Sequence, residues 1–167
     1  MDKYYYLVAQ LPFLEFGKES YISRQEFLEE AKRWLNEKEF SLLSQADINN
    51  LSLEEGYPEV LREYIEFERE LRQKLASLRK ALKKGQDYSL PEILKSLGKE
   101  DTPLEIEKYL LQLRWRFIEE KEVGHYFDLS FLILYFLKIQ ILERLFTFNK
   151  EKGKVKFNLL CKVNLLG

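Results

Sequence analysis

The feature that most constrains the fold is the apolar run at residues 128–148, DLSFLILYFLKIQILERLFTF. Residues 131–137 carry no charged side chain. A helix that is apolar on nearly all sides belongs in the interior of a protein or in a membrane. We therefore expect a central helix over this run, with Asp128 as its N-cap. The residues that we expect to be nearly inaccessible are Phe131, Leu134, Leu137 and Ile141.

Polar side chains inside the run argue against a membrane span. A span needs about 20 apolar residues, but Lys138 and Gln140 lie near the middle of the run. A lysine at the centre of a bilayer is costly unless it is paired or reaches the interface. We expect a buried helix with a polar side, no direct membrane span, and a Lys138 side chain that reaches solvent or a carboxylate.

The composition favours one helical domain over residues 1–167. The chain is 46% apolar and 33% charged, which is typical of a globular protein. Only 7 glycines and 4 prolines interrupt 167 residues, so long helices are favoured over many short strands. The predicted fold class is mainly α, a multi-helix bundle with a long helical hairpin.

The hairpin is predicted over residues 57–121. Its first helix, residues 57–84, has leucines and tyrosines at intervals of three and four, which is typical of a helix-pair seam. Its second helix begins after Thr102, which forms a capping box with Glu105. We expect the two helices to pack antiparallel, and the hairpin to project from the domain.

Shorter helices are predicted before the hairpin and at its tip. Ser23 and Glu26 form another capping box, which predicts a helix to about residue 35. A short helix is predicted at 40–48, and another at 91–97 in the connection of the hairpin.

The two terminal segments, residues 3–14 and 153–167, remain open between helix and short β-strand. The aromatic run of Tyr4, Tyr5 and Tyr6 suits a strand, and a short helix fits almost as well. After residue 154, apolar and polar side chains alternate until two consecutive leucines break the pattern. Short β-strands at the termini are therefore one of two options.

No catalytic, cofactor or metal motif is found in the sequence. It lacks a glycine-rich phosphate loop and a nucleophile elbow. The single His125 and single Cys161 have no ligand cluster around them. We therefore expect no enzyme activity, no cofactor and no metal. An enzyme with an unmarked carboxylate site would need Glu119, Glu122, His125 and Asp128 to gather in one polar pocket.

The cationic and aromatic run Arg114, Trp115 and Arg116 is the candidate interface. Tryptophan and arginine are enriched in protein interfaces, although consecutive helical residues point in different directions. A nucleic-acid partner is not expected, because the formal net charge is -1. A single cysteine fits a reducing compartment, so we expect a cytoplasmic location.

Several stretches resemble a known bacterial family. At the start of the chain these are YYYLVA at 4–9, LP at 11–12 and SRQEFL at 23–28. Further along they are FDLSFLILYFLKIQILER at 127–144 and EKG at 151–153. They are similar to a family of unknown function whose members are encoded beside V-type ATPase genes. That family is more distantly similar to the C (or d) subunit of the V/A-type ATPases.

The resemblance implies a non-catalytic helical subunit or assembly factor of a bacterial V-type ATPase. The C (d) subunit seats the rotor shaft on the membrane ring, so the implied partners are the shaft or the ring. The implied location is cytoplasmic, peripheral at the inner membrane through the ATPase complex. The alternative is a free-standing cytoplasmic helical adaptor for another protein partner.

Overall fold

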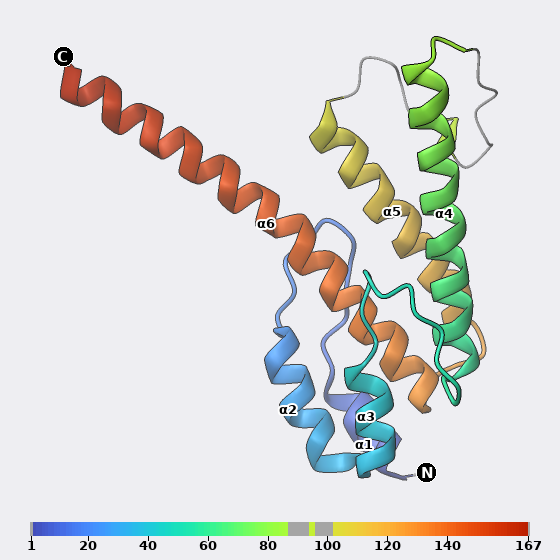
Figure 1. Ribbon diagram of the computed structural model, residues 1–167. Coiled ribbons are helices and arrows are strands. Elements are labelled where there is room, and N and C mark those ends of the chain that lie inside the picture. The colour runs from blue at the N-terminus through green and yellow to red at the C-terminus, as the bar shows by residue number, and fades with distance from the viewer. Residues whose placement is uncertain (1, 87–93, 96–101, 167) are drawn as a thin grey trace.

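The computed structural model describes residues 2–86, 94–95 and 102–166, and this part of the chain is mainly helical (Figure 1). This confirms the predicted mainly-α class. The α-helices are α1 (Asp2–Gln10), α2 (Arg24–Trp34), α3 (Glu37–Ser44), α4 (Glu59–Lys83), α5 (Pro103–Glu122) and α6 (Leu129–Leu166).

The first half of α6 is the centre of the bundle. It lies between the α2–α3 pair and the α4–α5 pair, and it contacts all four helices (Figure 1). Residues 132–142 are all buried, and the Oδ1 of Asp128 accepts a hydrogen bond from the Phe131 amide at 2.8 Å. Leu134, Leu137 and Ile141 are 0% exposed. Phe131, expected to be inaccessible, is only partly buried, as are residues 128–130, because the fully covered part of α6 begins at Leu132.

The strand option is wrong for the N-terminal segment, where residues 2–10 form α1. Leu7 is fully buried, and the Tyr4 hydroxyl donates to Glu39 at 2.6 Å. The Lys3 ammonium binds the same carboxylate at 2.7 Å. These contacts with α3 favour the helix over the strand that the aromatic residues suggest.

The strand option is also wrong for the C-terminal segment, because α6 continues without a break to Leu166. Gly153 costs a helix about 1 kcal/mol relative to alanine, but the lysines and glutamate around it are good helix formers. The second half of α6 extends away from the bundle (Figure 1). None of the described helices is both long and apolar enough to cross a membrane.

Helices α4 and α5 run side by side in opposite directions (Figure 1). Thr102 forms the predicted capping box with Glu105 at the start of α5. A separate apolar cluster lies between the two helices, towards their connection, and consists of Leu71, Leu94, Leu110 and Leu113. The short helix predicted at 91–97 lies outside the described residues, apart from positions 94 and 95.

Candidate functional site

A buried ion pair joins α4 to α5 beside the apolar cluster. Glu68 on α4 is 0% exposed, and it accepts hydrogen bonds from Arg114 Nε at 2.8 Å and Nη2 at 2.7 Å. Arg72, one turn further along α4, donates from Nε to the same carboxylate at 2.9 Å. One carboxylate therefore holds two guanidinium groups.

The pKa values of this pair favour the charged forms. Burial alone would raise the pKa of the Glu68 carboxyl, but the hydrogen bonds and charge of Arg114, and then those of Arg72, hold it below its usual value. Burial would lower the pKa of Arg114, but Glu68 raises it above its usual value. Both groups are therefore ionised at neutral pH.

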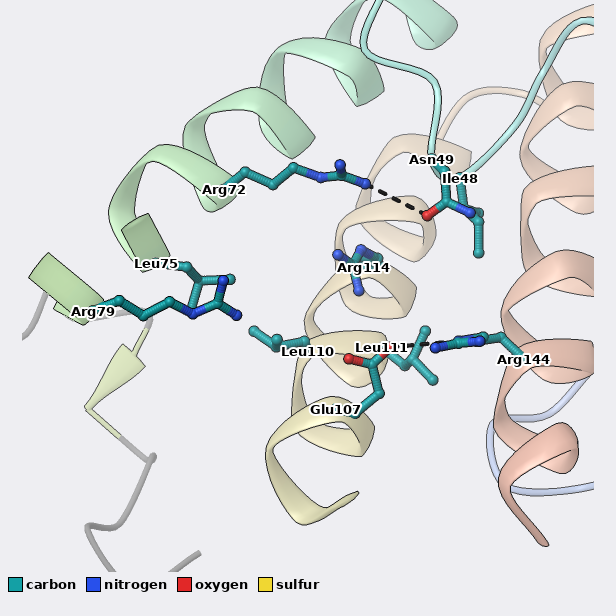
Figure 2. Close-up of a pocket in the computed structure, with 10 residues that line it drawn as sticks. All are labelled: Ile48, Asn49, Arg72, Leu75, Arg79, Glu107, Leu110, Leu111, Arg114 and Arg144. Carbon is teal, nitrogen blue, oxygen red and sulfur yellow. Dashed lines mark hydrogen bonds and ion pairs between the residues drawn. The ribbon is translucent and has the colours of Figure 1, made fainter. Parts of the chain in front are cut away.

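A cleft of about 470 Å³ opens beside this ion pair. Figure 2 shows that four arginine side chains surround it, with leucines between them. We name it the arginine cleft. Its lining residues are Ile48 and Asn49 from the loop after α3, Arg72, Leu75 and Arg79 from α4, Glu107, Leu110, Leu111 and Arg114 from α5, and Arg144 from α6.

The exposed arginines of the cleft differ in how firmly they are held, and Arg72 is the one fixed by a short hydrogen bond to Glu68. The Nε of Arg144 lies 3.6 Å from a Glu107 oxygen, which is longer than a hydrogen bond. Arg72 reaches Asn49 at 3.5 Å. The side chain of Arg79 makes no hydrogen bond or ion pair with any residue of the described ranges. These side chains are exposed and retain donors for another group.

The chemistry of the arginine cleft is that of anion binding. Its lining residues include no serine, threonine, cysteine, histidine or tyrosine, and Glu107 is the one carboxylate among them. Guanidinium groups remain protonated at neutral pH and do not act as general bases there. In the part of the chain that the structure describes, no group of three or more histidine, cysteine, aspartate or glutamate residues is placed to hold a metal ion.

The candidate interface of Arg114, Trp115 and Arg116 does not form one surface. Arg114 and Trp115 are buried, at 9% and 3% exposure, and only Arg116 is exposed. Trp115 packs against Phe16 and lies under the Lys138 ammonium. Consecutive helical residues point in different directions, so the first two join the interior and the third faces outward.

An active site built from carboxylates would need four residues to gather in one pocket, and the structure divides them among three different contacts. These residues are Glu119, Glu122, His125 and Asp128. Glu119 accepts a hydrogen bond from the Trp115 indole at 2.9 Å. Glu122 binds Lys138 at 2.7 Å, which agrees with the expectation that Lys138 reaches solvent or a carboxylate. The third contact is a 2.7 Å interaction between His125 and Asp128.

Sequence reasoning missed the arginine cleft because its residues come from three helices. Arg72 and Arg79 are seven positions apart, so they share one face of α4 with Leu75. That spacing was a detectable signal for half of the arginines. Nothing in the local sequence places Arg114 and Arg144 beside them.

Comparison with known proteins identifies a family. Residues 81–164 match the family model described as "Protein of unknown function (DUF2764)". No curated protein and no solved structure matches the chain. The matched residues include α5 and nearly all of α6, and therefore both Arg114 and Arg144. Because the match covers half of the 167 residues, the chain belongs to this family of unknown function, DUF2764.

Proposed function

We propose that this chain is a non-catalytic helical subunit or assembly factor of a bacterial V-type ATPase, similar in role to the central-stalk C (d) subunit. Its partners would be the rotor shaft or the membrane ring. It would act in the cytoplasm, at the inner membrane through the ATPase complex. The resemblance of residues 4–28 and 127–153 supports the proposal, and so does the extended shape of α6.

The observation that carries the proposal is the projecting half of α6. The helix has 38 residues, which corresponds to about 57 Å. Its second half leaves the bundle (Figure 1), and it exposes 57% of Leu159 and 62% of Leu160. A helix that stands alone in water is only marginally stable. Packing against a partner protein would stabilise this segment and cover its leucines.

The same observation also favours the second candidate, a free-standing helical adaptor. An adaptor would use the projecting half of α6 in the same way, on a partner outside the ATPase. The two candidates differ only in the identity of that partner. Recovery of the native complex therefore distinguishes them.

The test is affinity purification of the tagged full chain from its native host, after cross-linking. We expect ATPase subunits to be recovered, with cross-links to the second half of α6. The variant Leu159→Glu/Leu160→Glu should lose them. The control Leu82→Glu, which changes an exposed leucine on α4, should keep them. Recovery of no ATPase component would contradict the proposal, and a single unrelated partner dependent on the two leucines would favour the adaptor.

A further inference from the structure

We propose that the arginine cleft is a binding site for a small anionic molecule that carries a phosphate group. The proposal concerns a surface other than the projecting half of α6, and it does not depend on the ATPase role. It is drawn from the charge of the cleft, its free hydrogen-bond donors, its size and the leucines in its lining.

The charge around the cleft is not balanced by the chain itself. Four arginines line it, and their ion-pair partners among the described residues are two carboxylates, Glu68 and Glu107. Four positive charges against two negative charges leave an excess of two. Like charges held close together repel each other, and a bound dianion would relieve that repulsion. A metal cation alone would increase it.

The donors that face the cleft are available for a ligand. A guanidinium has five N–H donors, and Arg114 uses only Nε and Nη2 on Glu68. Its guanidinium is held by that buried carboxylate, so it is oriented before any ligand arrives. Arg79 has no hydrogen-bond or ion-pair partner among the described residues. Arg144 has the long contact with Glu107 and a stacking contact with the Phe148 ring at 4.6 Å, which leaves its N–H donors without a short hydrogen bond. Figure 2 shows these side chains arranged around one space.

The shape and chemistry of the cleft favour a phosphate compound over a simple halide or a cation. The planar fork of arginine matches two oxygens of a phosphate or carboxylate at once. A volume of about 470 Å³ lies within the usual range for small-molecule sites. Leu75, Leu110 and Leu111 also line the cleft, and they offer apolar contacts to the organic part of a phosphorylated molecule.

The test is isothermal titration calorimetry of the full chain at low ionic strength, with pyrophosphate and AMP as probes. We expect saturable binding of both, weakened by added salt because the attraction is electrostatic. The variant Arg79→Gln/Arg144→Gln should weaken binding by about ten-fold or more, because charge-assisted hydrogen bonds are lost. Both arginines are exposed, so the fold should be retained, and circular dichroism checks this.

The matched control is Arg62→Gln. Arg62 is also an exposed arginine on α4, but it does not line the cleft. We expect the affinity of this variant for pyrophosphate to remain within about two-fold of that of the original chain. The charge of Arg62 acts on the cleft only through the long-range electrostatic field, which salt screens. If Arg62→Gln and Arg79→Gln/Arg144→Gln weaken binding equally, the probe recognises overall charge and the cleft is not the site.

Two further probes identify the ligand class. Citrate carries comparable charge without phosphate, and we expect it to bind more weakly than pyrophosphate. Equal binding would overturn the phosphate assignment. If a glutamate-rich peptide binds and pyrophosphate does not, the cleft is instead a docking surface for an acidic protein segment. No heat of binding from any probe at millimolar concentration would overturn the proposal and leave the ATPase hypothesis untouched.

Discussion

The substitution Glu68→Gln tests the buried ion pair on which the arginine cleft is built. The substitution replaces one carboxylate oxygen with an amide nitrogen and removes one negative charge. The side chain keeps its size, so the packing between α4 and α5 is otherwise preserved. Glu68 is 0% exposed and Arg114 is 9% exposed. The variant therefore leaves the Arg114 guanidinium buried without a counter-charge.

The expected loss follows from the burial of the two partners. Removal of one partner from a buried ion pair typically costs about 3–5 kcal/mol. Glutamine keeps an oxygen that can accept one of the two Arg114 hydrogen bonds, and Arg72 is exposed enough to turn towards water. We therefore expect the lower end of that range, about 3 kcal/mol of unfolding free energy.

Urea denaturation followed by tryptophan fluorescence measures this loss. Urea is preferable to guanidinium chloride because a salt would screen the ion pair. The matched control is Glu70→Gln, an exposed carboxylate on α4 that pairs with Lys74; it should change stability by less than about 0.5 kcal/mol. The double variant Glu68→Gln/Arg114→Met should recover part of the loss, because no buried charge remains. A loss below about 1 kcal/mol for Glu68→Gln, or one equal to that of Glu70→Gln, would refute the reasoning.

Three other predictions use the same unfolding assay. Gln140→Leu should cost about 2–4 kcal/mol, because the buried Gln140 accepts from the Ile48 amide at 3.0 Å and donates to the same loop; hydrogen exchange at the Ile48 amide should accelerate. Lys138→Met should change the free energy of unfolding by less than about 1 kcal/mol, because its partner Glu122 can regain water. Glu122→Gln should cost about 2 kcal/mol, because it leaves the buried Lys138 ammonium without a partner. A larger loss for Lys138→Met than for Glu122→Gln would contradict this reasoning. Stability should also fall in acid, because the pKa of Glu68 is lower in the folded chain than in the unfolded one. The contribution of Glu68 to the free energy of unfolding is complete above the unfolded carboxyl pKa of about 4.3. It is lost as the pH falls through the folded pKa. Glu68→Gln should make this acid-dependent loss shallower.

The starts of α2, α5 and α6 could be predicted from sequence because the interactions that fix them are local, whereas the capping box of Asn36 and Glu39 was missed and α3 begins at Glu37 rather than at the predicted residue 40. Ser23 and Glu26 form both hydrogen bonds of the expected capping box, and Thr102 and Glu105 do the same. Asp128 caps α6 as expected. Each cap depends on residues three positions apart, so the sequence contains all the information that is needed.

The buried polar contacts could not be predicted, because their partners are distant in the sequence. The local sequence suggests that Arg114 lies on a surface, but Glu68, 46 residues earlier, makes its burial possible. The arginine cleft has the same origin, because α4, α5 and α6 must pack before its arginines come together. The terminal helix α1 also depends on such a contact, from Tyr4 to Glu39, 35 residues later.

Two polar side chains determine how α6 is rotated within the bundle. A helix that is apolar on nearly every side has little preference for which side faces which neighbour. Lys138 and Gln140 differ by two positions, or about 200° around the helix, and they bind different partners: Glu122 on one side and the loop after α3 on the other. Any other rotation would leave at least one of them buried without a partner, at a cost of several kcal/mol. This rotation also fixes Arg144 on the side of the cleft.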